Sequence, residues 1–142
     1  HALVIRDDNL LASILLHDVI EDTGVSKKEL PFNDEIKEIV SLVSFIRKQD
    51  EDKNEAKRIY YENILTNPKA CVVKIIDRCN NVSNMAAAYS KEKMMGYVVE
   101  TEEYVLPLAI HLKKNYPEYS DVVFLVRYQI IAILETVKNL VM

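Results

Sequence analysis

The sequence has very few of the residues that make tight turns, with 2 glycines and 4 prolines in 142 residues. Average usage is about 7% glycine and 5% proline, so this composition disfavours a sandwich or barrel of many short strands. No segment shows the strict alternation of apolar and polar residues that marks a half-buried strand. The composition therefore predicts an all-α protein.

Cysteine is also scarce. Cys71 and Cys79 form neither a C-x-x-C motif nor a disulfide framework, and such usage is typical of a reducing compartment. No stretch reaches the ~18 continuous apolar residues of a membrane span, and no signal peptide is visible. We therefore expect a cytoplasmic protein that does not bind membranes.

Positive charge is not in excess, because 18 lysines and arginines stand against 22 aspartates and glutamates, for a net charge of −4. This balance argues against a general nucleic-acid surface, although a local basic pocket is compatible with it. The length suits one domain, residues 1–142, whose core needs no disulfide or structural metal. Because the chain opens on His1 rather than methionine, we expect an N-terminal segment to be missing.

Capping residues and apolar periodicity predict a series of helices. The run from Leu10 to Leu16 is almost wholly apolar and predicts a buried helix, with Asp7, Asp8 and Asn9 as capping residues before it. Asn33 and Asn67 are candidate caps of later helices, and Ser90 begins another. We expect helices over residues 9–22, from 33 to about 46, 55–65, 68–89, 90–104 and 119–140, with a break or kink at Pro107.

Three of the expected helices carry an apolar face at helical spacing, which predicts core residues. On the second helix these residues are Ile36, Ile39, Val40, Val43 and Ile46. On the helix over residues 68–89 they are Val72, Ile75, Cys79, Val82 and Ala86. On the last helix they are Val122, Leu125, Val126, Ile130, Ile133, Leu134 and Val137.

The most informative feature is the string His17-Asp18-Val19-Ile20-Glu21-Asp22, which closes the apolar run. In a helix, His17 lies over Glu21, and Asp18 neighbours both Glu21 and Asp22. Carboxylates this close raise the pKa of at least one member unless a cation neutralises them. At a helix C-terminus the macrodipole also disfavours each acid by about 0.3–1 kcal/mol. An ordinary acidic helix end is therefore the weaker interpretation, and the string favours a divalent-cation site.

A second polar stripe contains Lys74, Asp77, Arg78, Asn81 and Asn84. Such a stripe is usually a solvated helix face, and the pattern alone favours that interpretation. The same residues can instead supply a metal carboxylate (Asp77) and phosphate donors (Lys74, Arg78, Asn81).

The other two histidines belong to no local motif. His1 is isolated at the terminus, where a surface residue or a tag remnant is the ordinary explanation. His111 lies among apolar residues, which favours a core or boundary histidine.

Taken together, His1, His17-Asp18 and the distant Asp77 resemble the H…HD…D signature of the HD-domain superfamily of metal-dependent phosphohydrolases. Residues 15–23, LLHDVIEDT, are similar to the LLHDVVEDT segment of RelA/SpoT-type (p)ppGpp hydrolases. Residues 73–82, VKIIDRCNNV, are similar to their VKLADRLHNM segment. The spacing of the two segments suits a small stand-alone hydrolase without a synthetase domain.

This resemblance implies a single HD-domain helical bundle that hydrolyses the 3′-pyrophosphate of (p)ppGpp, giving GDP or GTP and pyrophosphate. It implies one Mn²⁺ ion, and Glu21 and Asp22 as the catalytic carboxylates that orient or deprotonate water. Arg78 and Asn81 match positions at the nucleotide. The implied metal ligands are His1, His17, Asp18 and Asp77. The expected partner is a small nucleotide, without nucleic acid, and a homo-oligomer is compatible with the sequence.

The sequence departs from the family pattern in three places. His1 and His17 are sixteen positions apart, about two helical turns fewer than expected, so residues are expected to be missing between them. The basic and glycine-rich segment before the first histidine is absent. Asn80-Asn81-Val82 replaces the usual His-Asn-Met, and Ser83-Asn84 replaces a basic-threonine pair.

These departures leave two alternatives open. One is an HD phosphohydrolase for another nucleotide, such as a nucleoside monophosphate, an NADPH-like phosphate or a cyclic dinucleotide. The other is a nucleotide-binding HD domain without catalysis. All six metal and catalytic candidates are present, which argues against a loss of catalysis.

Overall fold

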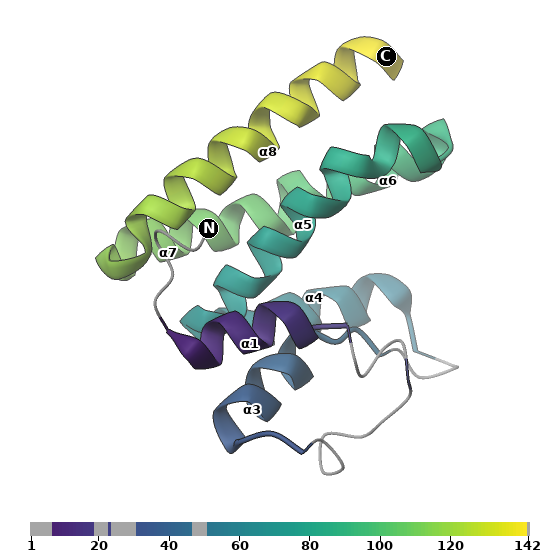
Figure 1. The fold of residues 1–142 in the computed structure, drawn as a ribbon. Helices are drawn as coiled ribbons and strands as arrows, with labels where there is room; N and C mark the ends of the chain where they lie inside the picture. The colour runs from purple at the N-terminus through teal and green to yellow at the C-terminus, as the bar shows by residue number, and fades with distance from the viewer. Residues whose placement is uncertain (1–6, 19–22, 24–30, 47–50, 142) are drawn as a thin grey trace. The chain divides into compact units, whose positions relative to one another are not determined.

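The computed structural model describes residues 7–18, 23, 31–46 and 51–141. Every regular element among these residues is a helix, which confirms the all-α prediction (Figure 1). None of these helices is both long and apolar enough to cross a lipid bilayer. The elements are α1 (Asp8–Leu16), α3 (Asp34–Val43), α4 (Lys53–Leu65), α5 (Pro68–Ala88), α6 (Lys91–Glu100), a π-helical turn η2 (Thr101–Val105), α7 (Leu106–Asn115), a 3-10 turn η3 (Pro117–Tyr119) and α8 (Ser120–Val141).

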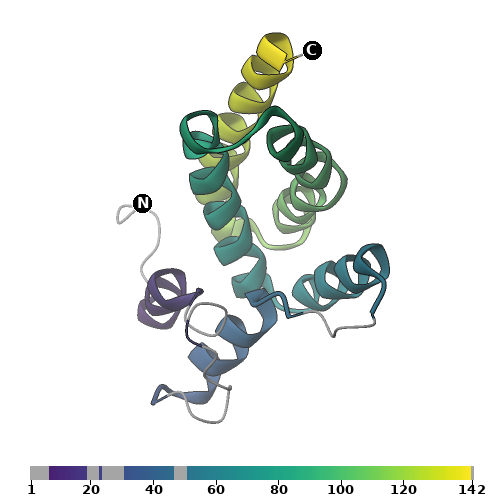
Figure 2. The ribbon, with the colours of Figure 1, turned by 90° about the vertical axis from the view of Figure 1, so that its right-hand side faces the viewer.

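The chain divides into two compact units, residues 1–73 and residues 74–142. The long helix α5 begins in the first unit and ends in the second (Figures 1 and 2). The expectation of a single domain over residues 1–142 stays a prediction.

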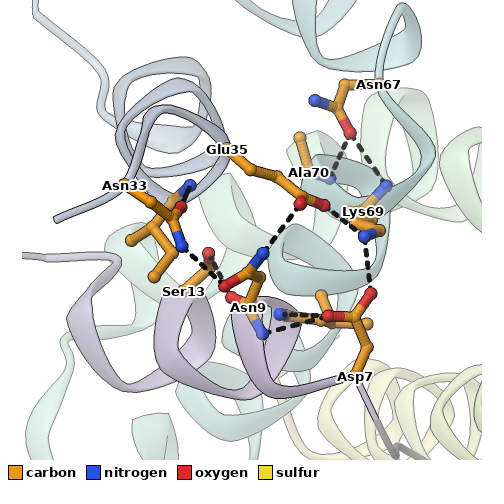
Figure 3. A network of polar contacts seen from close by, with 10 residues as sticks. Asp7, Asn9, Ser13, Asn33, Glu35, Asn67, Lys69 and Ala70 are labelled. Carbon is orange, nitrogen blue, oxygen red and sulfur yellow. Dashed lines mark hydrogen bonds and ion pairs between the residues drawn. The ribbon is translucent and has the colours of Figure 1, made fainter.

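In the first unit, Asn9 in the first turn of α1 joins this helix to the start of α3 by hydrogen bonds with Asn33 and Glu35 (Figure 3). The Asp7 carboxylate accepts hydrogen bonds from the backbone N–H groups of Asn9 and Leu10, at 3.0 and 3.1 Å. Asn33 caps α3, as predicted, and its side-chain amide donates to the Asn9 side-chain oxygen at 2.8 Å. The Asn9 amide donates in turn to Glu35, also at 2.8 Å. These bonds fix where α1 starts relative to α3.

Lys69, in the first turn of α5, links this junction to a third helix start (Figure 3). Its ammonium group pairs with the carboxylates of Asp7, at 2.5 Å, and Glu35. The two carboxylates raise the pKa of Lys69, and the lysine lowers the pKa of both acids. Asn67 caps α5 by accepting from the backbone N–H groups of Lys69 and Ala70. One cation therefore holds the first turns of α1, α3 and α5 together.

The predicted apolar face of α3 is confirmed in its helical part, where Ile36, Ile39, Val40 and Val43 are buried. The prediction for Ile46 is wrong, because α3 ends at Val43 and Ile46 is 69% exposed. Beyond the helix end, the spacing that places residues on one face no longer applies.

The prediction that α1 is buried along its whole apolar run is also wrong. Leu10 and Ser13 are its buried residues, whereas Leu15 is 84% exposed. Ala12 and Leu16 of α1 pack against the buried pair on α3, so the contact covers one stripe of the helix. An apolar run makes every side of a helix suitable for burial, but this packing needs one side only.

In the second unit, α5, α6 and α8 share a hydrophobic core. Its buried members are Cys79, Val82, Met85, Met94, Val98, Ile130, Leu134 and Val137. The predicted core stripe of α5 is right at Cys79 and Val82 and wrong at Ala86, which is exposed. On α8 the predicted core residue Leu125 is 56% exposed, because it lies off the stripe formed by Ile130 and Leu134.

The predicted irregularity near Pro107 lies slightly before it. The π-helical turn η2, residues 101–105, joins α6 to α7, and Pro107 lies in the first turn of α7 (Figure 1). Proline has no N–H group, and its ring clashes with the carbonyl four residues earlier in a regular α-helix. A wider turn immediately before the proline accommodates both effects.

Candidate functional site

His17 and Asp18 lie where α1 ends. Leu16 is the last residue of the helix, His17 is its C-cap and Asp18 follows in a turn. The helix thus ends earlier than the predicted Asp22, and residues 19–22 lie outside the described residues. Nε2 of His17 is 3.2 Å from a carboxylate oxygen of Asp18, with side chains 20% and 56% exposed respectively. An imidazole and a carboxylate are therefore paired at the helix end.

The His17 ring is oriented by its own helix. Nδ1 lies 2.5 Å from the carbonyl oxygen of Ile14, one turn earlier. Because a carbonyl oxygen can only accept, Nδ1 carries the proton and donates it. The final carbonyl groups of a helix have no intrahelical partner, so the Ile14 carbonyl is available for this bond. In metal sites, the ring nitrogen that does not bind the ion commonly donates to a backbone carbonyl in this way.

The pair fits the donor set expected for a divalent metal. In the neutral tautomer, the lone pair of His17 Nε2 faces the Asp18 carboxylate, so two electron-rich atoms lie 3.2 Å apart. A second proton on the ring or a cation shared by the two atoms would make this arrangement favourable. An imidazole nitrogen beside a carboxylate oxygen suits a first-row transition metal such as Mn²⁺.

The polar stripe of α5 is not a solvated face at its N-terminal end. Lys74 is buried and the Asp77 side chain is 15% exposed, with the ammonium nitrogen 3.7 Å from a carboxylate oxygen. Lysine and aspartate are rarely buried unless they are paired. The solvated-face interpretation therefore fails for these two residues. Asn81 is half-buried and follows one turn after Asp77 on the same side of the helix.

Arg78 has internal partners that the sequence did not reveal. Its guanidinium group is buried, pairs with Glu100 of α6 and donates to the Thr101 hydroxyl at 3.4 Å. It also lies over the ring of Tyr97, 4.4 Å from the centroid. Arg78 therefore attaches α5 to the junction of α6 and η2. No local pattern identifies these partners, because more than twenty residues separate Arg78 from Glu100.

Three of the predicted site residues lie outside the described residues: the metal ligand candidate His1 and the catalytic candidates Glu21 and Asp22. The assignments of all three stay predictions. His111 is half-buried, and the Asn115 amide donates to its backbone carbonyl at 3.0 Å, which confirms a boundary histidine.

Comparison with known proteins gives two relatives, and no family model matches the chain. The chain is 30% identical over 113 residues to a probable guanosine-3′,5′-bis(diphosphate) 3′-pyrophosphohydrolase of Synechocystis sp.. It is 31% identical over 111 residues to a probable GTP pyrophosphokinase of Mycobacterium leprae. Each match covers 75% of this chain but only 15% and 14% of the respective relative. These similarities support the resemblance to RelA/SpoT-type proteins, and the chain spans a small part of their length.

Proposed function

We propose that this chain is a metal-dependent phosphohydrolase that removes the 3′-pyrophosphate of (p)ppGpp, giving GDP or GTP and pyrophosphate. The observation that carries the proposal is the His17–Asp18 pair, whose Nε2 and carboxylate oxygen lie 3.2 Å apart at the end of α1. The residue strings around this pair and around Asp77 resemble those of (p)ppGpp hydrolases. One of the two relatives is named for this hydrolysis, which also supports the proposal.

His17, Asp18, Asp77 and His1 would hold one Mn²⁺ ion. Such an ion supplies positive charge at the reacting phosphate and makes a bound water easier to deprotonate. The Ile14 carbonyl keeps the lone pair of the His17 ring on Nε2, the nitrogen nearest Asp18. Lys74 lies beside Asp77, with its ammonium nitrogen 3.7 Å from a carboxylate oxygen, so a positive charge already faces this carboxylate.

Glu21 and Asp22 would activate the attacking water. A carboxylate within hydrogen-bond reach takes the proton from the water as the oxygen attacks phosphorus, and a second carboxylate can share or relay that proton. This assignment rests on the similarity of residues 15–23 to the family segment.

Lys74 and Asn81 would bind the phosphate and sugar of the nucleotide. An ammonium group recognises phosphate as a point charge, and a side-chain amide donates a directed hydrogen bond. Arg78 already pairs with Glu100, so we propose its contact with the nucleotide only alongside that structural role.

The test is side-by-side turnover of ppGpp, GMP, NADPH and a cyclic dinucleotide by the purified chain with added Mn²⁺. We expect ppGpp to be the preferred substrate, with equal amounts of GDP and pyrophosphate appearing by ion chromatography. Asp18→Asn should abolish this turnover, whereas Asp8→Asn, at an exposed position in the first turn of the same helix, should keep it. Parent-level activity in Asp18→Asn, or faster turnover of GMP, would contradict the proposal.

A further inference from the structure

The outer face of α8 carries an exposed aromatic pair. Phe124 and Tyr128 are 70% and 71% exposed, and their rings stack with centroids 6.4 Å apart. They line a groove of about 550 Å³ together with Arg127 and Ile131, and Lys113 of α7 also lines it. Exposed apolar surface of this kind commonly marks a site of protein association. This face carries none of the candidate site residues, so its role is separate from the proposed catalysis.

Opposite charges flank Phe124 at equal spacing. Asp121 precedes Phe124 by three residues and Arg127 follows it by three, and both line the groove. The Nε atom of Arg127 is buried and has no hydrogen-bond partner among the described residues. When two identical helices pair antiparallel about a two-fold axis at one residue, the residue three positions before it on one copy lies opposite the residue three positions after it on the other copy. The face is therefore complementary to itself in charge.

We propose that this face binds the same face of a second copy of the chain, with the two α8 helices antiparallel and the two-fold axis at Phe124. The two Phe124 rings then meet at the centre. Asp121 of each copy faces Arg127 of the other, so the symmetric contact forms two ion pairs. Ser120 of each copy faces Tyr128 of the other, which brings two hydroxyl groups together.

Other registers of the same pairing are less favourable. An axis at Tyr128 places Asp121 opposite Glu135 of the second copy, which brings like charges together. An axis at Val126 places Asp121 opposite Ile131, which removes water from a carboxylate without giving it a partner. The register at Phe124 pairs Asp121 with Arg127 in both directions, and this self-complementarity is the reason for choosing a second copy as the partner.

The contact extends over a few turns of helix, so it is expected to be smaller than a standard interface and to form a dimer in equilibrium with the monomer. Sedimentation equilibrium from about 10 µM to about 1 mM chain covers the affinities expected for such a contact. We expect the parent chain to dimerise in this range. Phe124→Ala should weaken the dimer by at least about tenfold, since it removes the central contact of the interface.

A charge swap provides the decisive comparison. Asp121→Arg alone and Arg127→Asp alone each place like charges opposite one another and should abolish the dimer. The double variant Asp121→Arg with Arg127→Asp restores opposite charges and should recover the parent affinity to within about threefold. Thr136→Arg, which adds a charge at an exposed position further along α8, is the matched control and should leave the dimer unchanged.

Circular dichroism and thermal unfolding of every variant separate loss of the interface from loss of the fold. Phe124 is mostly exposed, so its truncation removes little core packing. A parent chain that stays monomeric up to about 1 mM would overturn the proposal and leave the groove to a different partner. A dimer that Phe124→Ala leaves intact, or a double variant no better than the single ones, would also overturn it.

Discussion

The backbone carbonyl of Ile14 accepts a hydrogen bond from Nδ1 of His17, the C-cap of α1. Both groups depend on the end of the helix. The Ile14 carbonyl is one of the last in the helix and has no intrahelical partner, and the His17 side chain lies close enough to donate to it. It determines which nitrogen of the imidazole faces Asp18. The proposed metal site therefore depends on where α1 stops, as well as on which residues follow.

His17→Gln should lower Mn²⁺ affinity by more than about tenfold, because it removes the imidazole nitrogen beside Asp18. Isothermal titration calorimetry with Mn²⁺ measures the effect directly, without any assay of activity. His111→Gln is the matched control, since His111 is a half-buried histidine of the other unit. Equal affinities in the parent and His17→Gln would remove His17 from the ligand set.

Glu21→Gln should lower turnover of ppGpp by about 10²–10⁴-fold while metal binding is kept, because the amide keeps the shape of the side chain but cannot take a proton. The double variant with Asp22→Asn should cost less than the product of the single effects, since groups acting together are not additive. Single-turnover hydrolysis at saturating Mn²⁺, with metal content determined on the same samples, tests both statements. Glu92→Gln, exposed in the first turn of α6, is the control. If fully metallated Glu21→Gln hydrolyses ppGpp at the parent rate, the Glu21 carboxylate has no catalytic role.

Lys69→Met should lower the free energy of unfolding by about 1 kcal/mol at neutral pH, since the ion pairs with Asp7 and Glu35 are partly exposed and screened by solvent. Urea unfolding measures the loss, with Lys114→Met, at an exposed lysine of α7, as the control. A change no larger than the control would show that Lys69 does not join the three helix starts.

The same ion pairs give a pH dependence whose sign follows from the pKa directions. The pKa values of Asp7 and Glu35 are lowered from ordinary values of 3.8 and 4.5, so their stabilisation is present above these values and is lost as the pH falls through the lower folded values. The pKa of Lys69 is raised, so its contribution is present below the ordinary value of 10.5 and is lost only at pH values above it. The stability difference between the parent and Lys69→Met should therefore shrink in acid. A difference that stays constant down to about pH 2 would contradict the assigned pairs.

Arg78→Gln should destabilise the second unit by about 3 kcal/mol, because it leaves the Glu100 carboxylate, 16% exposed, without its cation. Arg78→Leu combined with Glu100→Leu should recover much of this loss, since no unpaired charge remains. Arg58→Gln breaks exposed pairs with Glu55 and Glu62 and should cost less than about 1 kcal/mol, which makes it the matched control. Unfolding in urea compares the variants, and equal losses for Arg78→Gln and Arg58→Gln would contradict a buried anchoring pair.

The local chemistry of the sequence predicted most helix starts correctly. Asn33, Asn67 and Ser90 each cap the helix that follows, because capping needs only a side-chain oxygen and the N–H groups two or three residues later. The pairing of His17 with Asp18 is likewise local, since the two residues are adjacent. Interactions between residues within about one helical turn of each other can be predicted from the order of the residues.

The tertiary structure decided which sides of these helices are covered. The apolar run of α1 made every side of the helix suitable for burial, and packing against α3 left Leu15 exposed. Similarly, Leu125 matched the apolar period of α8 but lies off the stripe that the core covers. Periodicity identifies the faces that can be buried, and the neighbouring helices determine which of them are.

The partners of the buried and partly buried cations could not be predicted from the sequence either. Arg78 and Lys69 each required a carboxylate, because a buried or partly buried cation is costly without one. The sequence offers 22 acidic residues, and only the packing of the helices selects Glu100 for Arg78, and Asp7 and Glu35 for Lys69. The sequence by itself thus determined most helix starts and the pairing of the adjacent histidine and aspartate. The tertiary structure chose the distant partners, because ion pairing depends on separation in space rather than along the chain.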